Sequence, residues 1–177
     1  MPSVYSDPLP AAPVARHTLA VIVDNEPGVL ARISGLFSGR GYNIESLTVS
    51  ETEHEKHISR ITIVTTGTDA EIEQIKAQLA RLVPVHRVRD LSEEGPTLER
   101  ELVLLKVVGQ GDHRVEALRL AQAFGARTLD ATLTSFVFEF TGTSEEVERF
   151  IALMADCGLV EVSRTGVAAM SRGAEAM

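Results

Sequence analysis

The sequence lacks both a second cysteine and any long apolar run. A helix that spans a bilayer needs about 20 consecutive apolar residues, and no segment of the chain has them, so we expect no membrane partner. The single cysteine, Cys157, excludes an intramolecular disulfide framework and is typical of the reducing cytoplasm. Because an unpaired cysteine packs as a small apolar side chain, we expect Cys157 to be buried.

Positive charge is also scarce. The chain has 17 Lys and Arg residues against 25 Asp and Glu residues, which gives a formal net charge of −8 at pH 7. Nucleic acids are bound through clustered basic side chains that neutralise phosphates, so we expect no nucleic-acid partner. With 44% hydrophobic and 24% charged residues, the composition is that of a folded globular protein.

Metal-binding and catalytic motifs are missing as well. His54 and His57 occur in HEKH, which differs from the H-E-x-x-H motif of zinc proteases, and the sequence has no C-x-x-C. His17, His86 and His113 are scattered along the chain without an evident nucleophile beside them. We therefore expect neither a metal site nor a catalytic residue in this chain.

The apolar residues form the same pattern twice. Each half predicts a strand, a helix, two strands, a second helix and a last strand, from alternating or helical spacing. The motif TSEE favours a capped start for the last helix. In the first half the segments are 18–24, 29–37, 43–50, 58–66, 72–82 and 83–91, and in the second half they are 101–109, 115–124, 126–133, 136–140, 147–154 and 159–166.

The order βαββαβ is that of a ferredoxin-like domain, so we predict an α+β protein of two such domains. In each domain we expect an antiparallel sheet with both helices on one face. The segment EEGPT (93–97) interrupts the pattern, as a linker does. The predicted organisation is a disordered, Pro-rich tail (1–16), a first domain (17–92), a linker (93–98) and a C-terminal domain (99–177).

The sheet face opposite the helices needs a cover in each domain. Antiparallel strands that face water alternate apolar and polar residues, but the segments 19–23 and 102–105 are apolar on both faces. Domains of this size also bury only about 60% of the surface of their unfolded chain, which favours association. We expect a second subunit or the sister domain to cover the open faces.

The turn DNEPG (24–28) leads from the first strand into the first helix. Pro27 suits the first helical position, where its missing N–H costs nothing. Gly28 has no Cβ, so a ligand can approach the free N–H groups of the helix start closely. Those N–H groups and the helix dipole attract an anion, and a carboxylate has the right size.

Two asparagines flank this helix. Asn25 precedes it, and Asn43 follows the GRGY turn at the predicted start of the second strand. An amide offers both a donor and an acceptor, so the pair suits a free amino acid, which needs an anion site and an acceptor for its ammonium group. The alternative is that Asn25 and Asn43 are only cap and turn residues.

The motif D-N-E-P-G-V-L, followed by a helix and G-Y-N-I-E-S-L, resembles an ACT domain, the amino-acid-sensing module of many biosynthetic enzymes. The whole of 18–173 is similar to the small regulatory subunit of acetolactate synthase (acetohydroxyacid synthase). The sequence departs from that family mainly in its Pro-rich N-terminus and its longer acidic hairpin ETEHEK. The segments that carry the resemblance are GLFSGRGYNIESLTV (35–49), SRITIVT (59–65), QIKAQLARLVPVHRV (74–88), RELVLLKV (100–107) and VEVSRTGVAAMSRG (160–173).

The resemblance implies a homodimer that pairs through its ACT domains and binds a branched-chain amino acid, usually valine, between them. Backbone N–H groups near Gly28 would hold the carboxylate, and the amide oxygens of Asn25 or Asn43 the ammonium group. Leu30 and Ile44 would contact the isopropyl group. The implied site consists of Asn25, Glu26, Pro27, Gly28, Val29 and Leu30 from one subunit with Asn43 and Ile44 from the other.

The resemblance further implies a non-catalytic subunit in valine, leucine and isoleucine biosynthesis. Such a subunit activates the large catalytic subunit of acetolactate synthase and confers feedback inhibition, and its C-terminal domain helps to contact that partner. Thiamine diphosphate, magnesium and FAD would belong to the catalytic partner, with no cofactor in this chain. The alternative is a free-standing ACT sensor that controls another enzyme or transcription.

Overall fold

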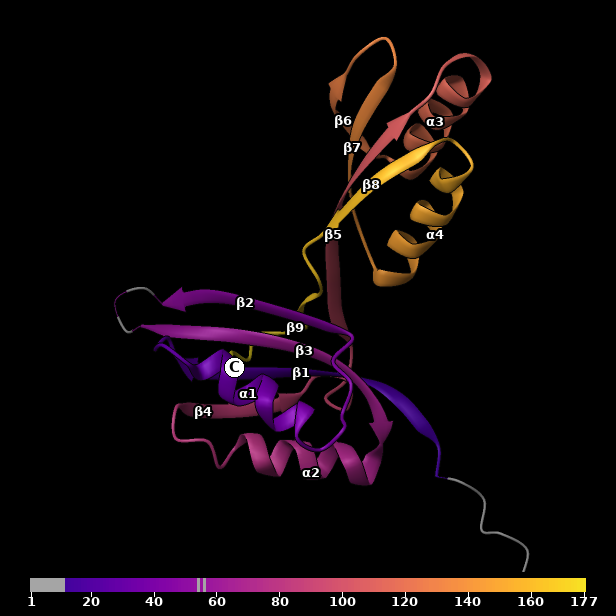
Figure 1. Ribbon diagram of the computed structural model, residues 1–177. Helices are drawn as coiled ribbons and strands as arrows, with labels where there is room; N and C mark the ends of the chain where they lie inside the picture. The colour runs from indigo at the N-terminus through magenta and orange to yellow at the C-terminus, as the bar shows by residue number, and fades with distance from the viewer. Residues whose placement is uncertain (1–11, 54, 56) are drawn as a thin grey trace, which may run out of the picture.

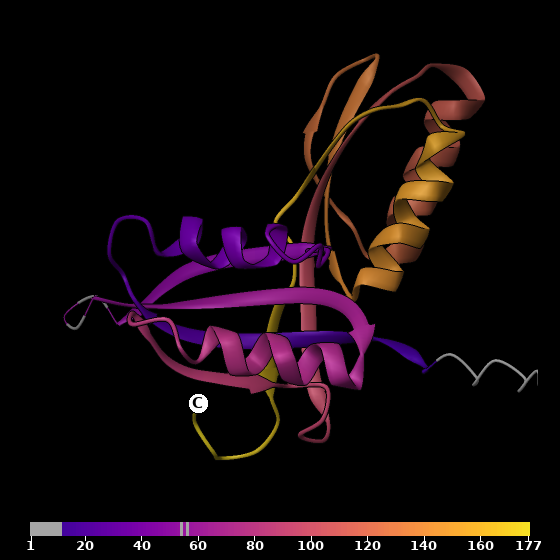
Figure 2. The same cartoon turned by 60° about the horizontal axis from the view of Figure 1, so that its bottom comes forward.

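The computed structural model describes residues 12–53, 55 and 57–177, and the predicted fold is confirmed (Figure 1). Strands β1 to β4 of the first domain form an antiparallel sheet in the order β2-β3-β1-β4. Figures 1 and 2 show both helices of this domain on one face of the sheet. The elements are β1 (Val14–Asp24), α1 (Val29–Ser38), β2 (Ser46–Glu53), β3 (Ile58–Thr68), α2 (Asp69–Leu79) and β4 (Val85–Asp90).

The C-terminal domain repeats this topology, with the sheet order β6-β7-β5-β8. The TSEE motif begins α4 with a capping box, in which Thr143 and Glu146 bond each other's backbone N–H groups. One further strand, β9, pairs with the first part of β5 and was not predicted. The elements are β5 (Thr97–Val108), α3 (Gly111–Phe124), β6 (Arg127–Ala131), β7 (Ser135–Gly142), α4 (Ser144–Ala155), β8 (Leu159–Arg164) and β9 (Ala168–Ser171).

Three strand starts differ from the sequence prediction by three residues or more. Strand β5 begins at Thr97, within the segment predicted as a linker, rather than at 101. β1 begins at Val14, within the segment predicted as a tail, because 14–16 pair with the end of β3 although their side chains are exposed. β2 begins at Ser46, so Asn43 lies in the loop after α1 rather than in a strand. Residues 1–11 of the predicted tail lie outside the described part of the chain.

Each domain has its own hydrophobic core between its sheet and its helices. Cys157 is 3% exposed and belongs to the second core, so its predicted burial is confirmed. The first core comprises Leu19, Val21, Val23, Val29, Ile33, Phe37, Ile61, Ile63, Ile72, Ile75 and Leu79. The second comprises Val103, Leu105, Val107, Ala117, Ala121, Phe136, Phe138, Phe140, Val147, Phe150, Met154 and Cys157.

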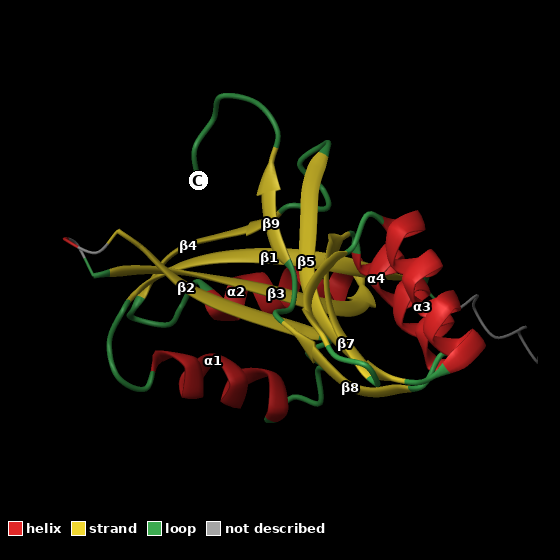
Figure 3. Ribbon diagram, turned by 90° about the horizontal axis from the view of Figure 1, so that it is seen from above, coloured by secondary structure: helices red, strands yellow, loops and turns green. Residues whose placement is uncertain are grey.

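The open face of the first sheet is covered by strands that continue from the C-terminal domain. The first part of β5 and its partner β9 cross the strands of that sheet (Figure 3). A small apolar cluster fills the contact and contains Ala20, Val64, Leu91, Val167 and Ala169. Strand β5 therefore belongs to both domains, and of the two covers expected for this face, the structure uses the sister domain.

Candidate functional site

The turn before α1 leaves the helix start without a cap. Gly28 occupies the N-cap position at φ +89°, a left-handed conformation that glycine adopts without steric cost, and no side chain caps the helix. A Cβ built at Gly28 would meet nothing within 4 Å, so open space lies in front of the helix. The first turn of α1 also contains no acidic residue. The helix start is therefore exposed, positively polarised and uncompensated.

The N–H groups around this helix start include two that are available to a ligand. Asn25 N–H donates to His57 O at 2.6 Å, and Glu26 N–H donates to Asp24 O at 3.0 Å. Among the described residues, Gly28 N–H and Leu30 N–H have no hydrogen-bond acceptor. These two donors belong to the orphan groups that every helix start leaves, and they can donate hydrogen bonds to a carboxylate.

The structure does not bring Asn25 and Asn43 together within one chain. They lie beyond opposite ends of α1, whose 10 residues span roughly 15 Å at 1.5 Å per residue. Both side chains are exposed, and Asn43 is held through its carbonyl oxygen, which accepts from Thr65 Oγ1 at 2.6 Å. One small ligand cannot contact both asparagines of the same chain, so a shared site requires two chains.

The apolar candidates differ in what they can offer. Val29 is 4% exposed and packs in the first core, so only its backbone faces the helix start. Leu30 is 43% exposed, and Ile44 is partly buried against the same core. Glu26 and Pro27 are exposed, and the Glu26 carboxylate lies 3.7 Å from Arg32 on the next turn of the helix. Leu30 and Ile44 are thus the side chains free to contact an aliphatic group.

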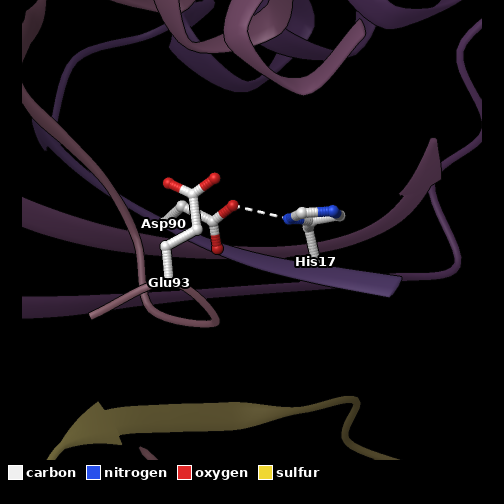
Figure 4. A group of neighbouring side chains, drawn as sticks. All are labelled: His17, Asp90 and Glu93. Atoms are coloured by element: carbon white, nitrogen blue, oxygen red, sulfur yellow. Dashed lines mark hydrogen bonds and ion pairs between the residues drawn. The ribbon is translucent and has the colours of Figure 1, made fainter. Parts of the chain in front are cut away.

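A second polar group, which sequence reasoning missed, lies at the end of β4 (Figure 4). His17 Nδ1 donates to Asp90 Oδ2 at 2.7 Å, and both residues are buried. Glu93 lies close enough that one nitrogen and two carboxylate oxygens fall within 4.8 Å of one another. However, Glu93 already pairs with Lys76 at 3.1 Å, and His17 and Asp90 already bond each other. We interpret this group as a structural contact that holds β1 to β4. The sequence gives no sign of it, because His17 and Asp90 are 73 positions apart.

These features define a class of protein, the ACT-type regulatory modules, in which a ferredoxin-like domain presents an uncapped helix start. A family model described as the ACT domain of acetohydroxyacid synthase small subunits matches 19–87, and one described as the small subunit of acetolactate synthase matches 100–173. The chain belongs to the family of acetolactate synthase small subunits. The resemblance stated from the sequence is confirmed.

Individual relatives agree over nearly the whole chain. A probable acetolactate synthase small subunit of Archaeoglobus fulgidus is 46% identical over 158 residues, which are 89% of this chain and 98% of that protein. The small subunit of acetolactate synthase isozyme 3 of Salmonella typhimurium is 43% identical over 163 residues, 92% of this chain and 99% of that protein. The crystal structure of the acetolactate synthase small subunit of Thermotoga maritima superposes with a TM-score of 0.82 at 36% identity, covering 91% of this chain and 99% of that one. Within the described residues, no helix is long and apolar enough to cross a membrane.

Proposed function

We propose that this chain is a non-catalytic regulatory subunit that binds a catalytic acetolactate synthase subunit, raises its activity and makes it sensitive to valine. Family membership supports the association with an acetolactate synthase. The observation that carries the effector site is the uncapped start of α1, where Gly28 N–H and Leu30 N–H have no acceptor among the described residues and the Cβ position of Gly28 is open. Thiamine diphosphate, magnesium and FAD are expected on the catalytic partner and not on this chain.

The proposed site is completed by a second copy of the chain. β2 is an edge strand of the first sheet, and the loop with Asn43 and Ile44 leads directly into it. An edge strand offers unpaired backbone N–H and C=O groups that a second copy can bond. A two-fold contact at this edge would place Asn43 and Ile44 of one protomer near the α1 start of its partner, which removes the roughly 15 Å separation within one chain.

The chemistry of the site matches a small aliphatic amino acid. The carboxylate would accept hydrogen bonds from Gly28 N–H and Leu30 N–H, where the helix dipole favours negative charge. The ammonium group would donate to the side-chain oxygen of Asn25 or of the partner's Asn43. The aliphatic side chain would lie against Leu30 and the partner's Ile44. A ligand that contacts both protomers stabilises one arrangement of the dimer, which is the requirement for coupling to a distant active site.

Calorimetric titration with valine, leucine and isoleucine tests the effector site. We expect the parent chain to bind valine and Asn43→Ala to bind it at least about tenfold more weakly, since the variant loses a charge-assisted hydrogen bond. Gln122→Ala, which removes an exposed amide on α3 in the other domain, is the matched control and should bind like the parent. Equal valine affinity for Asn43→Ala and the parent contradicts the site.

Reconstitution tests the partner. Adding the purified chain to a catalytic acetolactate synthase subunit should raise acetolactate formation, and valine should then lower it. If the chain binds valine but changes neither activity nor valine sensitivity of that subunit, it is a free-standing sensor for another target.

A further inference from the structure

The start of β2 touches the turn that follows β8, at the border of the two domains. Val167 N–H donates to Ser46 Oγ at 2.9 Å, and Thr48 Oγ1 donates to Thr165 O at 3.5 Å. We call the contact of Ser46 and Thr48 with 165–167 the domain joint. It is a polar contact that adjoins the apolar cluster under β9, to which Val167 contributes its buried side chain.

Gly166 lies at the closest point of the domain joint. Its φ is +82°, and a Cβ at this position would lie 2.8 Å from Ser46 Oγ and 2.9 Å from Thr48 Oγ1. Both distances are shorter than carbon–oxygen contacts allow, so only glycine lets the two segments meet in this way. The backbone of one domain therefore rests directly on two hydroxyl groups of the other.

In the C-terminal domain, hydrogen bonds and ion pairs connect the joint to the sheet and to α4. Thr165 N–H donates to Leu102 O at 3.0 Å, and Leu102 N–H donates to Thr165 Oγ1 at 3.1 Å. The preceding residue, Arg164, bonds both carboxylate oxygens of Glu101, at 2.7 and 2.8 Å, and also pairs with Glu148 of α4. A displacement of 165–167 would thus be passed to the central strand β5 and to α4 together.

On the side of the first domain, the joint is two residues from the proposed effector site. Ile44 and Ser46 are separated only by Glu45, so their Cα atoms are at most about 7 Å apart along an extended chain. Glu45 N–H donates to Val64 O at 2.8 Å, which holds this short segment against β3. A ligand that contacts Asn43 and Ile44 therefore acts on the same stretch of backbone that carries Ser46.

The joint also borders a cavity, which leaves room for movement. A cavity of about 560 Å³ lies between the domains, lined on one side by Glu45, Ser46 and Leu47 and on the other by Ser144, Glu148 and Gly166. Close-packed interfaces resist small displacements, whereas a contact at the edge of a cavity can shift without compressing side chains.

We propose that the contact between Ser46 and Gly166 transmits effector binding from the first domain to the C-terminal domain. The inference rests on the proposed function and specifies how the effector site regulates the catalytic partner. Effector binding fixes the position of the loop that contains Asn43 and Ile44, and with it the start of β2. Ser46 then sets the position of 165–167, and Arg164 and Leu102 carry the change to α4 and β5. The domain joint acts as a two-position element that the effector biases toward one position.

Two variants test the domain joint with the full chain assembled with its catalytic subunit. Ser46→Ala removes the acceptor of Val167 N–H without straining the backbone, and Gly166→Ala inserts the clashing Cβ. For each variant, valine affinity is measured on the free regulatory chain, and valine inhibition is measured on the assembled enzyme. Ser50→Ala, an exposed serine of the same strand, and Gly125→Ala, a left-handed glycine with no atom within 4 Å of its Cβ position, are the matched controls.

We expect both joint variants to bind valine within about twofold of the parent and to activate the catalytic subunit. The factor by which valine lowers the rate of the assembled enzyme should be about fivefold smaller than with the parent, the factor that one hydrogen bond contributes. Both controls should behave like the parent. Normal inhibition of the Ser46→Ala assembly overturns the inference, and so does a parallel loss of binding and inhibition. If the parent chain itself neither binds valine nor confers inhibition, the proposed function fails, and this inference fails with it.

Discussion

The two ferredoxin-like domains share a topology but differ at the start of their first helix. In the C-terminal domain α3 carries Asp112 in its first turn, and His113 Nδ1 donates to Asp156 O at 3.0 Å. In the first domain, α1 has no acidic residue in its first turn. Neither helix start has a side-chain cap, but Asp112 places a carboxylate in the first turn of α3, whereas α1 leaves its dipole open to an external anion. The difference is the one that the proposed effector site in the first domain requires.

The largest expected effect is on the free energy of unfolding, at a buried ion pair within the C-terminal domain. Glu101 is 4% exposed and bonds Arg164 through both carboxylate oxygens, and these hydrogen bonds raise the pKa of the Arg164 guanidinium, which stays charged. Glu101→Ala should lower the free energy of unfolding by about 2–3 kcal/mol, because Arg164 loses its charge-assisted partner.

Denaturant unfolding followed by circular dichroism measures this loss. Glu145→Ala, which breaks the exposed pair of Glu145 with Arg149, is the control and should change stability by less than about 1 kcal/mol. Equal stability of Glu101→Ala and the parent would show that the second domain does not depend on its internal charge pairs.

The comparison of the two helix starts can be tested by placing an acidic residue in the first turn of α1, as α3 has. Ala31 is exposed in the first turn of α1, and Ala31→Glu would place a carboxylate beside the free N–H groups. We expect valine affinity to fall about tenfold, equivalent to ~1.4 kcal/mol, since the new carboxylate competes for the same dipole. Calorimetry provides the measurement, and the neutral variant Ala31→Gln should bind nearly as well as the parent. Unchanged affinity in Ala31→Glu would place the valine carboxylate elsewhere.

The next prediction concerns two glycines of the same helix region. Gly28→Ala should destabilise the chain by about 1–2 kcal/mol, because alanine is strained in the left-handed conformation even though its Cβ meets no neighbour. Gly35→Ala, within α1 and equally free of neighbours, should stabilise it by about 0.5–1 kcal/mol through helix propensity. Thermal unfolding of the two variants measures both changes. A loss of stability in both would contradict the expectation that the backbone conformation of each glycine, and not the space around it, decides the sign of the change.

The smallest effect is a pH dependence of the capped helices. Hydrogen bonds from the Thr143 backbone and side chain lower the pKa of Glu146 below its ordinary value of 4.5. Since the folded-state pKa is depressed, this stabilisation is present above the unfolded pKa and is lost as pH falls through the folded one. The stability difference between the parent and Glu146→Gln should therefore shrink as pH is lowered below about 4.5. A difference that does not change with pH would argue against a charged cap.

The sequence predicted the elements with strong periodicity and missed those held by distant partners. The helix at 147–154 was recognisable because its apolar spacing and the TSEE cap agree, and the strand at 136–140 because its phenylalanines alternate. β9 has four residues and is recognisable only through its pairing with β5, which is about 70 positions away in sequence. In the same way, the exposure of the α1 start followed from DNEPG, but the approach of Gly166 to Ser46 did not. Long-range contacts between short polar segments leave no periodic signal.

The sharing of β5 and β9 between the domains also has a consequence for biosynthesis. As the chain leaves the ribosome, the first domain can form its sheet and helices, but the cluster that contains Ala20 and Val64 is complete only after Val167 and Ala169 have been made. The packing of Ala20 and Val64 thus depends on residues made about 150 and about 100 positions later, and a chain truncated before β9 would leave this cluster incomplete.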